Sequence, residues 1–135
     1  MIRQLDERTC VSGQIAADHV GDLAAQGFTV IVNNRPDGEE DGQPSASTIE
    51  QAAAAAGLKY HHIPIVRGIG PSDVEAMEEA LAGAGDGKLL AFCRSGTRSA
   101  YAIAVARRRS GASPDEVERS LSDAGFDPGP IAHLL

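Results

Sequence analysis

The sequence predicts an α/β fold in which a central, mostly parallel sheet of four to five strands is flanked by helices. Short apolar runs alternate with stretches of helical spacing along the whole chain. Such apolar runs are typical of strands buried on both faces, as in a parallel sheet covered by helices. With 135 residues, of which 42% are hydrophobic and 23% charged, the chain has the size and composition of one globular domain. We therefore expect residues 1–135 to form a single domain.

The first part of the chain is predicted to contain two strands and one helix. Residues 8–14 read as a short strand, and the apolar spacing over 15–26 predicts a helix with Gly27 as its C-cap. Residues 28–32 follow as a buried strand. The segment 33–44 contains two prolines and two glycines among acidic residues, which is typical of a loop. Because it directly follows a strand, this loop is a candidate wall of a site.

The middle of the chain continues the alternation of helix and strand. We expect a helix over 45–56, a third strand over 59–65 and a glycine-containing loop over 66–70. Either Asp73 or Ser72 can cap the helix that comes next.

That helix is predicted to end near Gly83 or Gly85, before an apolar strand over 88–92. Cys93 therefore stands at the carboxyl end of a strand. Ligands of open parallel sheets bind beyond these ends, so the segment that begins at Cys93 lies where a site is expected.

The last part of the chain is predicted to be helical and then irregular. A helix is expected over 99–109. Ser113 and Pro114 have the residue types of an N-cap and a first helical position, so they open a second helix. Residues 123–135 are expected to close the chain without regular structure.

The loop 93–99, which reads Cys-Arg-Ser-Gly-Thr-Arg-Ser, has the features of an anion-binding nucleophilic site. Its backbone N–H groups are expected to point inward at the start of a helix, where an anion is stabilised. Gly96 permits a backbone conformation that other residues resist, and Arg98 offers a planar fork of donors to an oxyanion. Ser99 can hydrogen-bond the sulfur of Cys93. A thiolate beside arginine at a helix N-terminus has a pKa below the free value of ~8.5, which makes Cys93 the candidate nucleophile.

The other polar residues of this region are candidates for binding the substrate, and they are Arg94, Ser95, Thr97 and Arg35. The alternative for Cys93 is a buried, inert cysteine before an ordinary helix. Two flanking arginines argue against that alternative. Cys10 has only Arg8 as a positive neighbour, and we interpret it as structural.

Composition excludes several classes of partner. The net charge of −7 disfavours a nucleic-acid or anionic-membrane binder, since both require a basic face. No apolar stretch approaches the ~20 residues of a membrane span, and no secretory signal is recognisable, so a cytoplasmic location is expected. The adjacent histidines His61 and His62 would point to opposite faces of a strand, so they cannot chelate one metal. We predict neither a metal nor a cofactor, and the sequence carries no signal for an oligomeric state.

A cysteine and an arginine that flank a glycine-containing loop after a strand resemble the signature loops of cysteine phosphatases and rhodaneses. The phosphatase loop is Cys-x5-Arg, whereas four residues separate Cys93 from Arg98, as in the shorter rhodanese loop. The segments 30–40 and 60–65 resemble the layout of dual-specificity phosphatases. More narrowly, residues 34–39 together with the loop 93–99 are similar to the bacterial phosphatase-like domain found alone or fused to β-lactamase-like hydrolases. Members of that family are also described as sulfur transferases.

This resemblance implies a cysteine phosphatase-like fold with Cys93 as nucleophile and Arg98 as the oxyanion clamp. In dual-specificity phosphatases an aspartate follows the third predicted strand, but here the loop 66–70 contains no carboxylate. A general acid could instead come from Asp37, Glu39 or the neighbouring Glu40 in the loop 33–44. The alternative is that these carboxylates form a solvated acidic loop or hold the site's arginines in place.

Three functions remain open from the sequence. The first is a phosphatase-like hydrolase with a phosphocysteine intermediate at Cys93. The second is a rhodanese-type sulfurtransferase with a Cys93 persulfide, which needs no strong acid. The third is a non-catalytic module that binds an oxyanion or phosphorylated ligand. Aromatic residues make up only 4% of the chain, which favours a small anionic or sulfane-sulfur substrate over one held in a deep aromatic cleft.

Overall fold

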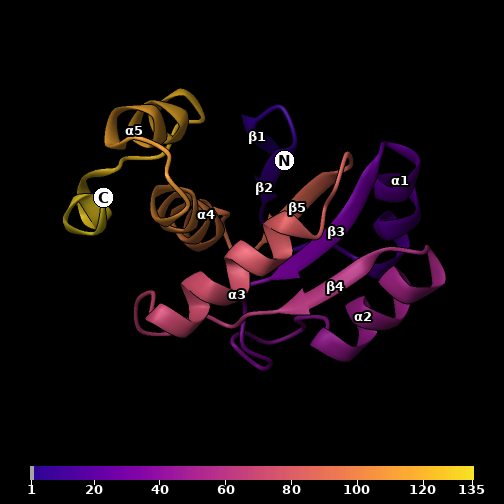
Figure 1. Cartoon of the computed structure of the whole chain (residues 1–135). Helices are drawn as coiled ribbons and strands as arrows, with labels where there is room; N and C mark the ends of the chain where they lie inside the picture. Colours follow the sequence, from indigo (N-terminus) through magenta and orange to yellow (C-terminus); the bar gives the residue numbers. More distant parts are fainter. Residues whose placement is uncertain (1) are drawn as a thin grey trace.

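A five-stranded sheet with helices on both faces forms the centre of the computed structural model, which describes residues 2–135 (Figure 1). The strands are β1 (Arg3–Asp6), β2 (Thr9–Ser12), β3 (Phe28–Asn33), β4 (Lys59–His62) and β5 (Lys88–Phe92). The helices are η1 (Ala17–His19), α1 (Val20–Ala25), α2 (Ala46–Ala55), α3 (Pro71–Ala82), α4 (Thr97–Arg109), α5 (Pro114–Asp123) and η2 (Gly129–Leu134), where η denotes a 3₁₀ helix. The predicted α/β fold is confirmed.

The strand order is β1-β2-β5-β3-β4, in which β1 is antiparallel to β2 and all other pairs are parallel. β5 is the central strand, with β2 and β3 as its neighbours. The carboxyl ends of β2, β5, β3 and β4 therefore meet at one edge of the sheet. Cys93, the residue after β5, lies in the middle of that edge.

The two faces of the sheet bury separate hydrophobic clusters because side chains alternate along each strand. Ile31 and Leu90 face a cluster with α1 and α2, whereas Val32 and Leu89 face a cluster with α3, α4 and α5. Figure 1 shows this division, with α1 and α2 on one side of the strands and α3 to α5 on the other. The central strands are buried on both faces, as the sequence predicts.

The strands of the structure differ from the prediction at β1 and at β4. β1 was not predicted, because this edge strand buries only Leu5 and pairs with β2 alone. The strand predicted over 59–65 ends at His62, since Pro64 has no N–H for a ladder bond. The N–H groups of Ile63 and Ile65 nevertheless donate to the carbonyls of Asn33 and Asn34.

The helices begin and end close to the predicted residues, with four corrections. The helix predicted over 15–26 is shorter, comprising η1 and α1. Gly70 is the N-cap of α3, and the Asp73 carboxylate accepts a hydrogen bond from the Gly70 N–H at 2.8 Å. α4 begins at Thr97 rather than Ser99, and the terminal segment predicted to be irregular contains η2.

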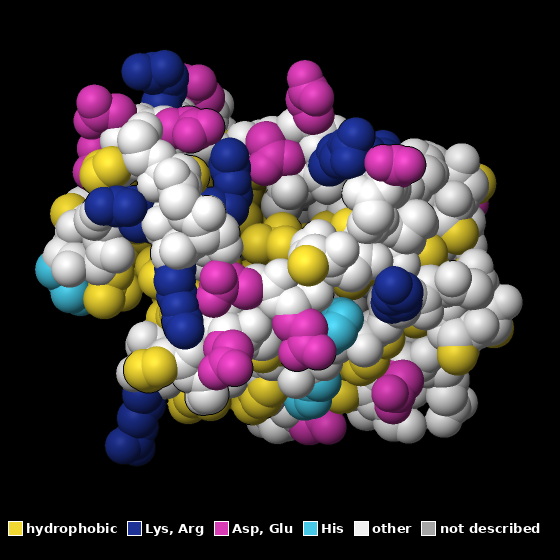
Figure 2. All heavy atoms as spheres, viewed as in Figure 1, with side chains coloured by type: hydrophobic (Ala, Val, Ile, Leu, Met, Phe, Trp, Pro, Cys, Tyr) yellow, Lys and Arg dark blue, Asp and Glu magenta, His cyan; other side chains and the backbone are white. Residues whose placement is uncertain are grey.

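Acidic and basic side chains are mixed over the face shown in Figure 2. Several of these charges pair across elements: Arg107 lies 3.4 Å from Asp6, and Arg109 lies 3.3 Å from Glu78. None of the helices in residues 2–135 is both long and apolar enough to cross a membrane.

Candidate active site

The loop between β5 and α4 places the sulfur of Cys93 beneath the start of a helix. Gly96 is the N-cap of α4 and has a φ of 93°, a left-handed conformation that favours glycine. Its N–H donates to Cys93 Sγ, with N and Sγ 3.1 Å apart. Gly96 therefore has a backbone conformation that other residues resist, as the sequence predicts, and the helix N-terminus faces the thiol.

The loop packs closely against the end of β2. A Cβ at Gly13 would lie 3.0 Å from the carbonyl oxygen of Arg94, tighter than most contacts of real Cβ atoms. The Cys93 N–H also donates to the Ser12 carbonyl at 3.2 Å. The backbone of the loop is thus held by the neighbouring strand.

Two opposing effects act on the ionisation of Cys93. Its side chain is fully buried, and this burial would raise the pKa of the thiol. Hydrogen bonds from the backbone N–H groups of Ser99, Ser95 and Gly96 stabilise the thiolate and outweigh burial, so the pKa of Cys93 is lowered. For Cys10, by contrast, burial raises the pKa of the thiol. Of the two free cysteines, Cys93 is the one whose thiol pKa is lowered.

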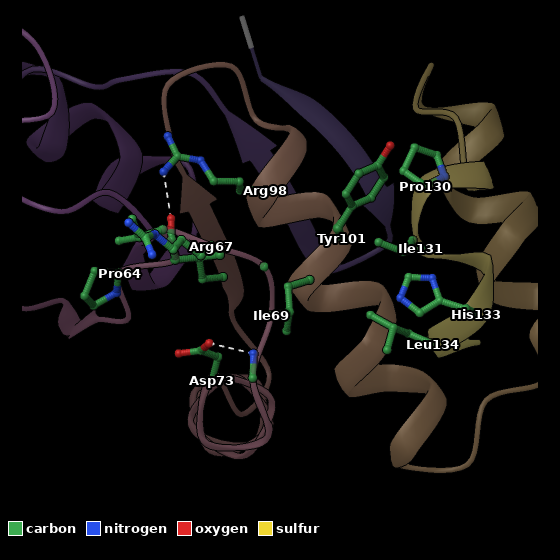
Figure 3. Close-up of a pocket in the computed structure, with 14 residues that line it drawn as sticks. Pro64, Arg67, Ile69, Asp73, Arg98, Tyr101, Pro130, Ile131, His133 and Leu134 are labelled. Atoms are coloured by element: carbon green, nitrogen blue, oxygen red, sulfur yellow. Dashed lines mark hydrogen bonds between the residues drawn. The ribbon is translucent and has the colours of Figure 1, made fainter.

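Arg98 spans the site from the first turn of α4. Its Nη1 donates to Glu39 Oε2 and to the Ile65 carbonyl, both at 2.8 Å, and its Nη2 donates to Glu39 Oε1 at 2.7 Å. Figure 3 shows the Arg98–Ile65 bond. Hydrogen bonding to Glu39 raises the pKa of Arg98, and the nearby Cys93 thiolate raises it further. The guanidinium is therefore bound to Glu39 and lies close enough to Cys93 for the two charges to interact.

Glu39 and Glu40 link three arginines around the loop. Arg35 Nε donates to Glu39 Oε1 at 2.9 Å, and Arg35 Nη2 lies 3.2 Å from Glu40 Oε1 without the alignment of a hydrogen bond. Arg94 Nε lies 3.5 Å from the other oxygen of Glu40. The Arg35 side chain is fully buried, so it can influence a substrate mainly through these carboxylates.

The carboxyl group of Glu39 is held in its ionised form. Hydrogen bonds from Arg98 lower the pKa of Glu39 against an opposing effect of burial, and hydrogen bonds from Arg35 add to the lowering. A carboxylate with a lowered pKa is a weaker base than usual and carries no proton to donate at neutral pH. These contacts are those expected if Glu39 holds the site's arginines.

Asp37 lies at the start of α2 rather than beside Cys93. Its Oδ1 accepts a hydrogen bond from the Ala46 N–H at 2.7 Å, next to the N-cap Ser45. The structure therefore brings Cys93, Arg98 and Glu39 together but directs Asp37 toward the helix end.

A buried contact between Ser99 and Asn34 was not predicted. The Ser99 hydroxyl donates to Asn34 Oδ1 at 2.7 Å, and Asn34 Nδ2 donates to the Ile63 carbonyl at 2.9 Å. The hydroxyl also lies within reach of Cys93 Sγ, but its single proton can serve only one acceptor. The position of Asn34 just after a predicted strand, at the edge of the sheet where ligands bind, could have indicated that it belongs to the site.

The remaining polar residues are more peripheral. Ser95 Oγ donates to Thr97 Oγ1 at 3.2 Å on the exposed side of the loop. Gln14, which was also not predicted, accepts a hydrogen bond from Arg35 Nη1 at 2.9 Å. His62 Nε2 lies 2.6 Å from the Arg35 carbonyl oxygen. Within residues 2–135, no three His, Cys, Asp or Glu side chains are grouped so that they could hold a metal ion.

Comparisons with known proteins agree on the fold around this loop. Residues 1–110 match the family model "Beta-lactamase hydrolase-like protein, phosphatase-like domain". The chain is similar to a candidate phosphatase of Neisseria meningitidis Z2491, nma1982, with a TM-score of 0.78 and 32% identity over 98% of this chain and 94% of that one. It also has the fold of Tk-PTP in its active form, with a TM-score of 0.66 and 23% identity over 98% and 92% of the two chains.

The chain is also 37% identical over 130 residues to the beta-lactamase hydrolase-like protein of Xylella fastidiosa (strain Temecula1). This similarity covers 95% of the present chain but only 30% of that relative, so the chain spans less than a third of its length. The family match, the solved structures and the Cys93 loop lead to one assignment. The chain belongs to the family of phosphatase-like domains of beta-lactamase hydrolase-like proteins, and its fold is that of phosphatase-type enzymes.

Proposed function

We propose that this protein is a cysteine-dependent phosphatase-like hydrolase whose nucleophile is the Cys93 thiolate. The observation that carries the proposal is the environment of Cys93 Sγ, which receives N–H donors from the loop at the start of α4 and has Arg98 beside it. These donors both activate the sulfur and form a cradle for a tetrahedral oxyanion.

The reaction has two steps. Cys93 Sγ attacks the phosphorus of a phosphate monoester, so that an S–P bond forms while the P–O bond to the leaving group breaks. Water then attacks the phosphocysteine, which breaks the S–P bond and releases phosphate and the thiolate. The backbone N–H groups of residues 94–99 and the Arg98 guanidinium stabilise the charge on the phosphoryl oxygens. In this proposal Arg94, Ser95, Gly96, Thr97 and Ser99 act chiefly as the wall of the cradle.

The leaving group must obtain its proton without a strong acid. Asp37 binds the start of α2, and Glu39 is ionised and shared between Arg98 and Arg35. We infer that Glu39 positions Arg98 and that good leaving groups, such as aryl oxides, depart with help from water. Turnover is therefore expected to be faster for aryl than for alkyl phosphates.

Sulfur transfer is the second candidate function, and two features of the site favour it. The loop has four residues between Cys93 and Arg98, and breaking an S–S bond needs no strong acid. Here Cys93 Sγ would take the outer sulfur of thiosulfate as sulfite leaves, and the persulfide would pass that sulfur to a thiol or to cyanide.

One paired experiment separates the candidates. Phosphate release from para-nitrophenyl phosphate and thiocyanate formation from thiosulfate and cyanide are measured with the unmodified chain, Cys93→Ser and Cys10→Ser. The proposal expects phosphate release that Cys93→Ser abolishes and Cys10→Ser retains. Cys93-dependent thiocyanate formation without phosphate release would contradict the phosphatase proposal and favour sulfur transfer. The absence of both activities would leave a module that binds oxyanions without turnover.

The sequence-based expectations about the substrate, the cellular location and the cofactor stay predictions. We expect a small anionic substrate, a cytoplasmic location and no need for a cofactor.

A further inference from the structure

A cleft of about 690 Å³ opens beside the candidate active site (Figure 3). One wall is the loop 64–70, the second is the first turns of α4, and the third is η2 at the end of the chain. Clefts of this size accommodate organic molecules much larger than phosphate.

The cleft and the Cys93 loop are joined through Arg98. Arg98 lines the cleft, and its Nη1 donates to the carbonyl of Ile65, which lines the same cleft. A phosphoryl group held by Arg98 would therefore have the cleft as the adjoining space for its ester substituent.

The walls of the cleft are largely apolar. Ile65 and Ile131 are buried beneath it, and Ile69 and Leu134 face each other from the loop and from η2 in Figure 3. Three large hydrophobic side chains are exposed among residues 2–135, and two of them, Val66 (68%) and Leu134 (39%), line this cleft. In Figure 2 hydrophobic side chains are visible around η2 at the left of the view. Apolar surface concentrated beside a reactive group favours an apolar ligand.

The charged side chains that line the cleft favour an anion. Arg67 is exposed, makes no ion pair among residues 2–135 and lines the cleft together with Arg98 and His133. The single carboxylate of the lining, Asp73, is engaged by the Gly70 N–H. The lining thus has two arginines and one carboxylate, and because Arg98 is bound to Glu39, Arg67 is the arginine available to a second anionic group.

We propose that the cleft binds the ester substituent of the substrate, and that the substrate is an amphipathic phosphate monoester with an apolar body and a second anionic group. This inference rests on the proposed phosphatase function. The phosphoryl group would lie in the 93–99 loop at Arg98, the apolar body against Ile69, Ile131 and Leu134, and the second anion at Arg67.

Binding of inert phosphonates tests the proposal without turnover. NMR titrations of the full chain with methylphosphonate, hexylphosphonate and phosphonohexanoate give affinities and the residues that respond. We expect affinity to rise from methylphosphonate to hexylphosphonate, since each buried methylene adds roughly a fourfold gain. A further rise to phosphonohexanoate is expected because its carboxylate can pair with Arg67. The two longer probes should shift the amide signals of residues 64–70 and 129–134, whereas methylphosphonate should act mainly on residues 93–99.

Matched variants assign the two parts of the cleft. Arg67→Gln should lower the affinity for phosphonohexanoate about tenfold, the size expected for one charged hydrogen bond. The affinity for hexylphosphonate should be unchanged. Its control is Arg119→Gln, which changes an exposed arginine on α5 that makes no ion pair within the described residues 2–135. Val66→Ser should lower the affinity for both hexylphosphonate and phosphonohexanoate. Its control is Ile2→Ser, which changes an exposed hydrophobic residue outside the cleft.

The outcomes separate this proposal from the function on which it rests. Equal affinity for all three phosphonates, or equal effects of Arg67→Gln and Arg119→Gln, would overturn the cleft proposal while the phosphatase function stands. If no phosphonate shifts the signals of residues 93–99 and Cys93-dependent phosphate release is absent, the proposed function fails and this inference fails with it.

Discussion

Glu39 accepts hydrogen bonds from Arg98 through both carboxylate oxygens, with Oε1 2.7 Å from Nη2 and Oε2 2.8 Å from Nη1. The two residues come from the loop after β3 and from α4, 59 positions apart in the sequence. This pairing fixes the plane of the guanidinium beside Cys93. It also means that an oxyanion binding to Arg98 must share the guanidinium with Glu39 or displace it.

Replacing Glu39 by glutamine tests whether it positions Arg98 or donates a proton. Glu39→Gln should lower kcat/KM for phosphate esters by about tenfold, because Arg98 loses a charged hydrogen-bond partner. The loss should be the same for good and poor leaving groups, measured across a series of substituted aryl phosphates.

The control for this variant is Glu75→Gln, an exposed glutamate on α3. A loss that grows as the leaving group becomes poorer would identify Glu39 as the general acid instead.

Asp37 is expected to stabilise the fold rather than the reaction. Asp37→Asn should lower the free energy of unfolding by about 0.3–1 kcal/mol, since asparagine keeps an acceptor for the Ala46 N–H but loses the negative charge at the start of α2. Urea unfolding measures this loss, and Asp41→Asn in the same loop is the control. A strong loss of kcat with normal stability would return Asp37 to the catalytic mechanism.

The ionisation of Cys93 should be visible by ultraviolet absorbance of the thiolate. In a Cys10→Ser background, with Cys10→Ser/Cys93→Ser subtracted, the midpoint is expected below the free-thiol value of ~8.5 because loop N–H groups stabilise the thiolate. A midpoint above that value would show that burial dominates.

The same shift predicts a pH dependence of stability. Because the folded pKa of Cys93 is depressed, its ionisation contributes stability that is fully present above the unfolded pKa and is lost as the pH falls through the folded pKa. Urea unfolding of Cys10→Ser and of Cys10→Ser/Cys93→Ser across this pH window should show the Cys93-linked dependence only in the former.

Gly96→Ala should disturb the site more than an equally strained substitution elsewhere. A non-glycine residue at the φ of 93° costs about 1–2 kcal/mol and would draw the N–H away from Cys93 Sγ. Gly111→Ala is the matched control, with a φ of 114° and no atom near the added Cβ. Both variants should lose stability by urea unfolding, but only Gly96→Ala should weaken methylphosphonate binding and raise the pKa of Cys93.

Local signals in the sequence determined several features of the fold. The apolar strand 88–92, the Ser113 cap with Pro114 and the glycine of the 93–99 loop depend on residues within a few positions of one another. Alternation of such strands with helices was enough to predict a parallel sheet. Cys93 was placed correctly because the end of a strand and the start of a helix are both visible in the sequence.

Tertiary structure alone decided which partners these residues find. The pairing of Arg98 with Glu39, the contact of Ser99 with Asn34 and the place of Asp37 at α2 all join segments that the sequence leaves independent. The edge strand β1 and the cleft beside η2 likewise depend on how the ends of the chain pack. Carboxylates in one short loop look alike in sequence, and only the packing of β3, α2 and α4 gives Asp37 and Glu39 different hydrogen-bond donors.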